Sequence, residues 1–399
     1  MADALARILE DDSYGALVIA GDVYDRSIPS PEAVDLFGSF LGKVKKKRPS
    51  LEVIVIPGNH DSASRLGFGR ELFARLGIRF AVSAEECDRP LIIESGGESC
   101  AFFLLPFLNP GVLSKEVLSE DDTGGTVPLR SQSAMAEEAA RRMDKARQEF
   151  TGLKSAGQGL AYSVLVAHLF ALGGTEAGSE RVFLGNAESV NPALFSGFDY
   201  IALGHLHRCQ STGEKAWYSG SPLAYSFGEA GQDKYFLSVE LEEEKTKVEK
   251  IPVKPRRKVT SLSGPFARFA GTEEDGIEDP GLTDASEDYL EIRLTDRGIT
   301  ENARELLRKR FPYLLSLRQD EALARLSSVS GTSLEDRRDT PGRNLDLDFK
   351  EFLSSLYGEA DLPGISADLP MDVSTELSEE IMLFGTLLVE VESETFKEA

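Results

Sequence analysis

Ala16-Leu-Val-Ile-Ala-Gly-Asp22-Val-Tyr-Asp25 and Val53-Ile-Val-Ile-Pro-Gly-Asn59-His60-Asp61 are the two stretches that decide the fold of this chain. Each is a continuous apolar run of strand length that stops at a glycine, and polar side chains follow at once. Runs rich in Val and Ile, without polar alternation, are typical of strands buried on both faces of a sheet. Ligand sites of open α/β sheets lie beyond the carboxyl ends of such strands. The two runs therefore predict one shared metal or catalytic site.

The same pattern returns twice further along the chain, in Ser163-Val-Leu-Val-Ala-His168 and in Tyr200-Ile-Ala-Leu-Gly-His205-Leu-His207. All 4 histidines of the sequence thus lie just past the end of an apolar, strand-like run. A single histidine in such a place is more often a structural residue than a ligand. Four of them, together with Asp22 and Asn59, favour a site.

The side chains at these strand ends offer oxygen and imidazole ligands, without thiolate. Such a set suits Mn²⁺, Mg²⁺, Fe or Zn²⁺, and its carboxylate and amide content favours manganese-like ions. The carboxylate of Asp22 can bridge two cations about 3.5–4 Å apart, as in two-metal hydrolases. His60 would then act on the phosphate or the leaving oxygen as an acid or a charge stabiliser. Asp61 follows His60 directly, and its presence also has a purely structural explanation. Its carboxylate would orient the adjacent loop through bonds to backbone amides.

Composition and missing motifs exclude several classes of protein. The formal net charge of -23 argues against a generic nucleic-acid binder, although metals or a partner can supply positive charge to a DNA enzyme. No Walker A or Gly-x-Ser-x-Gly motif occurs, which excludes P-loop NTPases and serine hydrolases with a nucleophile elbow. The 3 cysteines form no Cys-x-x-Cys pair. No membrane span or secretion signal is recognisable, and we expect a cytoplasmic protein.

The order of predicted elements indicates a large α/β domain followed by smaller units. A helix over 31–48 joins the first two strands, and alternation over 235–253 predicts a hairpin. A small β-α-β unit is expected within 289–317. Apolar stripes at 349–356 and 381–391 predict two helices, which pack either on each other or on a partner. The expected domains are residues 1–254, 255–325 and 326–399.

Taken in order, these blocks resemble the motifs of the calcineurin-like metallophosphoesterase superfamily: Gly21-Asp22, Gly58-Asn59-His60-Asp61, His168 and Gly204-His205-Leu206-His207. The flanking residues, among them Asp199–Arg208 and Tyr218–Phe227, are similar to those of the SbcD family of nuclease subunits. This resemblance implies a β-sandwich flanked by helices, with a small α/β cap and C-terminal helices.

The resemblance also implies a site for two divalent ions, Mn²⁺ or else Mg²⁺. Asp22 would bridge the metals. Asn59, His168 and His205 would complete one metal site, and His207 would belong to the other. His60 would be the catalytic residue that assists phosphodiester cleavage.

Members of the SbcD family cut DNA together with an SbcC-type coiled-coil ATPase, and the resemblance extends that expectation to this chain. The implied activity is a metal-dependent double-strand exonuclease and a hairpin or single-strand endonuclease, in DNA repair, recombination and replication. The implied partners are double-stranded DNA ends and hairpins, and the ATPase, in a heterotetramer of two nuclease and two ATPase subunits. Alternatives are a non-catalytic or degenerate subunit of that ATPase, and a phosphodiesterase acting on small nucleotides.

The chain departs from the superfamily pattern at its start. The superfamily begins with a strand ending in Asp-x-His, which supplies two metal ligands, but no histidine precedes His60. The first metal would keep only Asp22 and His207, and the strand at 16–20 would lack a neighbour. We therefore expect an N-terminally incomplete nuclease, with weak or absent nuclease activity even in manganese.

Overall fold

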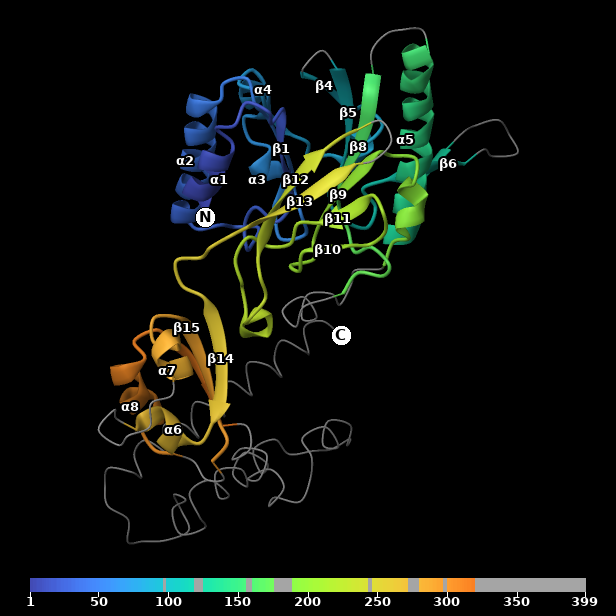
Figure 1. The fold of residues 1–399 in the computed structure, drawn as a ribbon. Coiled ribbons are helices and arrows are strands. Elements are labelled where there is room, and N and C mark those ends of the chain that lie inside the picture. Colours follow the sequence, from blue (N-terminus) through green and yellow to red (C-terminus); the bar gives the residue numbers. More distant parts are fainter. Residues whose placement is uncertain are drawn as a thin grey trace, which may run out of the picture. The chain divides into compact units, whose positions relative to one another are not determined.

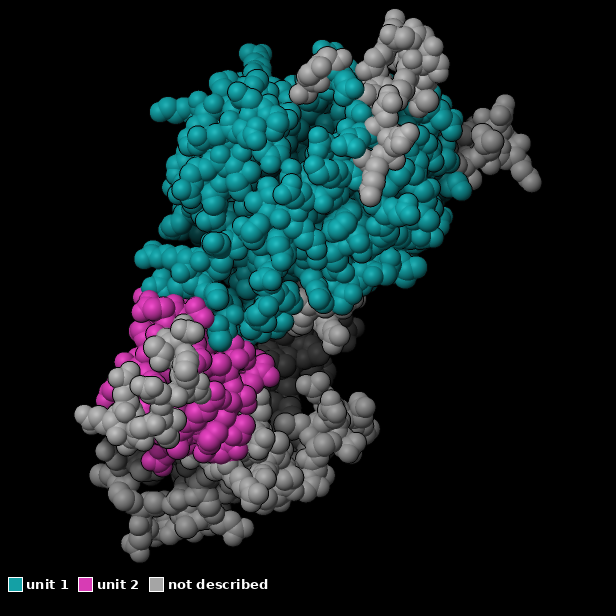
Figure 2. Space-filling model, viewed as in Figure 1, with its two compact units in different colours: residues 1–260 teal, residues 261–399 magenta. Residues whose placement is uncertain are grey.

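The computed structural model describes eight stretches of the chain: residues 1–95, 98–117, 125–155, 160–175, 189–242, 246–271, 280–296 and 300–319. They belong to two compact units, Met1–Thr260 and Ser261–Ala399, which Figure 2 colours separately. Sheets and helices alternate along the chain, which confirms the predicted α/β class. The two helices expected within 326–399 lie outside the described residues, and the division into three expected domains stays a prediction.

The first unit begins with a parallel three-stranded sheet in the order β1-β2-β3. Its strands are β1 (Ala16–Ala20), β2 (Glu52–Ile56) and β3 (Ile78–Phe80). Strand β2 is buried on both faces as predicted, whereas β1 is only half-buried because it lies at the edge of this sheet. Among the described strands, β1 pairs with β2 alone.

Two helices cover one face of this sheet, α1 (Ala2–Ile8) and α2 (Pro31–Lys47) (Figure 1). Helix α2 connects β1 to β2 as predicted. It starts where the Ser30 hydroxyl accepts a hydrogen bond from the amide of Ala33, with Pro31 in the first turn. Three lysines, Lys45, Lys46 and Lys47, lie in the last turn, where cations complement the helix dipole.

A second sheet of six strands has the order β10-β11-β9-β8-β5-β4. Its central strands β5, β8, β9 and β11 are parallel, while β4 and β10 pair antiparallel at the two edges. The strands are β4 (Leu91–Ser95), β5 (Glu98–Leu105), β8 (Leu160–His168), β9 (Tyr200–Gly204), β10 (Gln210–Ser211) and β11 (Ala216–Tyr218).

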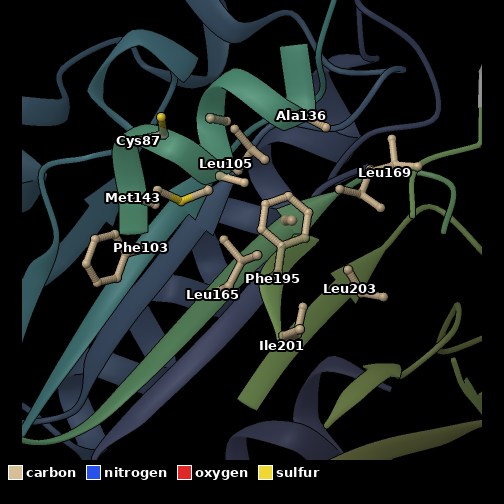
Figure 3. Packing of buried hydrophobic residues seen from close by; sticks show 14 of the residues in the cluster. Cys87, Phe103, Leu105, Ala136, Met143, Leu165, Leu169, Phe195, Ile201 and Leu203 are labelled. Atoms are coloured by element: carbon tan, nitrogen blue, oxygen red, sulfur yellow. The ribbon is translucent and has the colours of Figure 1, made fainter. Parts of the chain in front are cut away.

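Helix α5 (Gln132–Ser155) covers the outer face of the six-stranded sheet. Figure 3 shows Ala136 and Met143 of this helix among the side chains of the sheet, including Phe103 and Leu165. The inner faces of the two sheets share another core, in which Ile54 and Ile56 of β2 gather with side chains of β5 and β8. The first unit is therefore a β-sandwich with helices on both outer faces.

Short elements complete the first unit. They are the helices α3 (Ala63–Leu66) and α4 (Arg70–Ala74), the 3₁₀ helices η1 (Ala84–Glu86), η3 (Pro192–Phe195) and η4 (Phe227–Glu229), and the antiparallel pairs β6 (Ser114–Val117) with β7 (Gly125–Pro128) and β12 (Tyr235–Glu240) with β13 (Lys247–Pro252). The β12–β13 hairpin was predicted from its alternating pattern.

The second unit contains a sheet in the order β14-β15-β16. Its strands are β14 (Val259–Gly264), β15 (Tyr289–Leu294) and β16 (Leu314–Arg318), and its helices are α6 (Phe266–Ala270), α7 (Pro280–Ala285) and α8 (Ala303–Arg310). Strands β15 and β16 are parallel and α8 joins them, as the predicted β-α-β unit requires. In neither unit does a described helix have the length and apolar character needed to cross a membrane.

Tyr218 fixes the segment that follows β8. Its side chain is fully buried, and its hydroxyl donates to the carbonyl of Leu169 and accepts from the amide of Ala171, both at 2.8 Å. One hydroxyl thereby satisfies two buried backbone groups next to His168.

We expect Tyr218→Phe to lower the free energy of unfolding by about 1–3 kcal/mol, because a buried amide and a buried carbonyl lose their partner. Urea denaturation measures this difference. The matched control is Tyr235→Phe, which removes a hydroxyl whose bond within the described part of the chain is to the exposed Asp233 carboxylate at 3.4 Å, and it should stay within about 0.5 kcal/mol. Equal effects of the two variants would contradict the assignment.

Candidate metal centre

The ends of four strands, β1, β2, β8 and β9, come together at one edge of the sandwich. The first two belong to the three-stranded sheet and the last two to the six-stranded sheet. Three non-glycine residues have a positive φ in the described part of the chain, and two of them follow these strands: Asp22 at 50° and His205 at 109°. Such left-handed backbone is strained for these residues and is frequent at functional sites.

Glycines allow the strand ends to approach this closely. A Cβ atom at Gly204 would overlap the carbonyl oxygen of Ala20, and one at Gly58 would overlap the carboxylate of Asp22. A Cβ at Gly21 would overlap the imidazole ring of His168. Gly21 and Gly204 are therefore required by contact between the two sheets, and Gly58 by contact between the loops after β1 and β2.

We expect Gly204→Ala to destabilise the protein by about 3 kcal/mol or more. The added carbon would clash with the backbone carbonyl of Ala20, which cannot move aside as a flexible side chain could. Thermal unfolding or urea denaturation measures the loss. The control is Gly38→Ala in α2, where no described atom outside the local helix backbone lies within 4 Å of the added carbon. That control should stabilise the helix by about 0.5–1 kcal/mol, since alanine is the better helix former. A harmless Gly204→Ala would contradict the close approach.

Four of the predicted ligands converge at this edge. Nε2 of His168 lies 3.3 Å from Oδ2 of Asp22 and 3.0 Å from Oδ1 of Asn59. Nδ1 of His205 lies 3.1 Å from the same Asn59 oxygen. One ligand atom from each of Asp22, His168 and His205 lies within 4.8 Å of the others, the spacing of a group that can hold a metal ion.

The hydrogen bond at the far side of His168 determines which nitrogen faces this cluster. Nδ1 of His168 lies 2.8 Å from the carbonyl oxygen of Ala20, which can only accept, so Nδ1 carries the hydrogen. In the neutral ring, Nε2 then carries an electron pair that faces two further acceptors, the oxygens of Asp22 and Asn59. Such electron pairs repel one another unless a proton or a metal cation lies between them.

The ionisation of these groups agrees with a cation site. Burial would raise the pKa of Asp22, but the nearby imidazole of His168 and the amide of His60 lower it to about 2. Burial opposes charge on His168, yet the Asp22 carboxylate outweighs burial and raises the pKa of His168. Burial and the adjacent His168 lower the pKa of His205 to about 4, so its ring is neutral near pH 7. The residues present therefore fit a divalent ion.

Comparison with protein families matches residues 1–209 to the calcineurin-like phosphoesterase family. The chain belongs to this family. The matched region of the metallophosphoesterase domain contains the four converging side chains, together with His60 and His207. Family membership establishes a metal-dependent phosphoesterase domain, and the cluster provides a place in it for a divalent ion.

His60 lies at the same edge of the metallophosphoesterase domain. Its backbone amide donates to Oδ1 of Asp22 at 3.0 Å, and its Nδ1 donates to the carbonyl oxygen of Asp25 at 2.9 Å. The ring is partly exposed. The structure thus places His60 next to the ligand cluster, and its catalytic role stays a prediction.

Asp61 has the structural role that the sequence left open. Its carboxylate accepts hydrogen bonds from the amides of Gly58 at 2.9 Å and of Val23 and Tyr24 at 3.0 Å. These bonds tie the loop after β1 to the loop after β2. The prediction that Asp61 orients the adjacent loop is confirmed.

His207 has an acidic partner that the sequence did not predict. Its Nδ1 lies 2.9 Å from Oε1 of Glu229, a wholly buried carboxylate in η4. Sequence analysis missed Glu229 because it lies in an irregular segment with no strand or helix pattern. The one available signal was its position just beyond the Tyr218–Phe227 block that is similar to the SbcD family.

We expect the affinity of the metallophosphoesterase domain for Mn²⁺ to fall about tenfold per pH unit below the raised pKa of His168. The metal and the proton compete for Nε2 of His168, whereas Asp22 stays ionised because of its low pKa. Isothermal titration between about pH 5 and 8, in two buffers of different ionisation heat, measures both affinity and proton release. Constant affinity with no proton release would contradict this site.

Proposed function

We propose that this chain is a manganese-dependent DNA nuclease, the phosphodiesterase subunit of an SbcC–SbcD type complex in DNA repair and recombination. The observation that carries the proposal is the convergence of Asp22, Asn59, His168 and His205 beside His60 in a phosphoesterase domain. The nuclease assignment within that family rests on the similarity of the flanking residues to the SbcD family.

The residues at the site supply what phosphodiester hydrolysis needs. Divalent ions held here, by the four converging side chains and by His207, would make a bound water more acidic and balance the charge of the phosphate. In His60, the bond from Nδ1 to the Asp25 carbonyl fixes the ring, so Nε2 is the nitrogen that exchanges a proton with substrate. The amide bond from His60 to Asp22 keeps that ring at the cluster.

Binding of DNA requires local positive charge in a chain of net charge -23. The described segment that follows β13 carries four cationic residues within five positions, Lys254, Arg256, Arg257 and Lys258. A two-metal site and a basic surface on an ATPase partner would add to it. We propose linear double-stranded ends and hairpins as substrates, and a coiled-coil ATPase as the partner.

The unaltered chain is expected to cleave DNA only weakly in Mn²⁺, because Asp22 and His207 alone would remain as ligands of the first metal. We expect His60→Gln to lower this weak rate further, by up to about 10²–10⁴-fold, the contribution typical of a general acid. The assay follows end-labelled linear duplex and hairpin DNA, with and without an SbcC-type ATPase and ATP. Glu240→Gln, which changes an exposed ion pair of the β12–β13 hairpin, is the control and should cut at the unaltered rate.

The same assay separates the other functions. Hydrolysis of cyclic or small nucleotides without any cleavage of DNA would show a nucleotide phosphodiesterase and contradict the nuclease proposal. Stable binding to the ATPase with neither Mn²⁺ binding nor cleavage would show a non-catalytic subunit.

A further inference from the structure

Glu229 and Lys234 form a buried ion pair that contacts His207. Glu229 has no exposed surface, and its Oε1 lies 2.9 Å from Nδ1 of His207. Its Oε2 accepts from Nζ of Lys234 at 2.5 Å. Both carboxylate oxygens are therefore bonded away from water.

Lys234 bonds to the backbone of the same histidine. Its Nζ donates to Oε2 of Glu229, to the hydroxyl of Ser221 at 2.8 Å and to the carbonyl oxygen of His207 at 3.0 Å. These three bonds match the three hydrogens of an ammonium group. Glu229 thus contacts the imidazole of His207, while Lys234 contacts both Glu229 and the backbone of His207.

Stability alone is a weak reason to bury such a pair. Removing two charges from water costs about as much as their attraction returns, and apolar residues of similar size often serve equally well. A carboxylate bonded to the far nitrogen of a histidine has a more specific effect, because it fixes both the orientation of the ring and the position of its hydrogen.

We propose that Glu229 is a positioning residue that holds His207 with its hydrogen on Nδ1, so that Nε2 presents an electron pair to a divalent ion. This inference rests on the proposed function, in which His207 is a metal ligand. The backbone carbonyl of Ala20 does the same for His168. Lys234 fixes Glu229 in the required orientation, because its ammonium group bonds to the second carboxylate oxygen.

Glu229→Gln tests the proposal with a nearly isosteric change. The ammonium group of Lys234 can only donate, so it will bind the amide oxygen of the new side chain. The amide nitrogen then faces Nδ1 of His207 and donates to it. The hydrogen of the ring must therefore move to Nε2, the nitrogen intended for the metal.

Nitrogen-15 NMR of histidine-labelled, metal-free protein shows directly which ring nitrogen of His207 carries the hydrogen. The chain has 4 histidines, and loss of one signal pair in His207→Gln assigns His207. We expect hydrogen on Nδ1 in the unaltered protein and on Nε2 in Glu229→Gln. Hydrogen on Nε2 of His207 in the unaltered protein, or on Nδ1 in Glu229→Gln, would overturn the proposal.

A second variant covers the case in which Glu229→Gln does not fold. Glu229→Met combined with Lys234→Met removes both buried charges and retains volume, a change that buried pairs often tolerate. Nδ1 of His207 then loses the Glu229 carboxylate, and we expect the ring form with hydrogen on Nε2 to appear beside the other in the spectrum. A ring that keeps its hydrogen entirely on Nδ1 would overturn the proposal.

Titration with Mn²⁺ separates this proposal from the proposed function. We expect Glu229→Gln to weaken binding at the site that includes His207 by about 10–100-fold, as for other groups that orient metal ligands. Glu240→Gln is again the matched control, since its carboxylate pairs with Lys247 at the surface at 3.2 Å. Unaltered protein with the expected ring form but no Mn²⁺ binding would contradict the proposed function and the metal part of this inference, and would leave the positioning by Glu229 standing.

Discussion

The candidate site depends on a positive charge, a proton or a metal cation, between acceptor atoms that the fold holds close together. Nε2 of His168 lies 3.0–3.3 Å from Oδ1 of Asn59 and Oδ2 of Asp22, and His168 is almost entirely buried. Water cannot easily separate them, and burial makes uncompensated charge costly. The fold must therefore supply enough contact energy elsewhere to keep these groups together until a cation arrives. The two apolar faces of β2 and the close contact at Gly204 provide that constraint.

The sequence was sufficient to predict the strands and their ends. Val53–Ile56 is apolar at every position because alternate side chains enter two different cores, one under the helices and one between the sheets. The glycines at 21, 58 and 204 marked where each strand stops. Since parallel strands end at a common edge, the convergence of Asp22, Asn59, His168 and His205 followed from topology.

Other features could not be read from the sequence because they depend on contacts between distant segments. Strand β14 alternates Val259-Thr-Ser-Leu-Ser-Gly264, with too few apolar positions to stand out from the preceding basic segment. Glu229 lies 22 positions from His207, in a segment without a regular period. Its buried carboxylate pairs with Lys234, whose ammonium group also donates to Ser221. The half-burial of β1 depends on its place at the sheet edge, which an apolar run alone does not reveal.

The four converging ligands are divided equally between the two sheets: Asp22 and Asn59 follow strands of one sheet, His168 and His205 follow strands of the other. A bound ion would consequently act as a cross-link between the layers of the sandwich, in addition to any chemistry it performs. Metal binding and the packing of the two sheets would then be thermodynamically linked. A change that weakens the packing between the sheets would also lower the affinity for the ion. Side chains far from the site, such as those packed between the sheets, would in this way set the strength of metal retention.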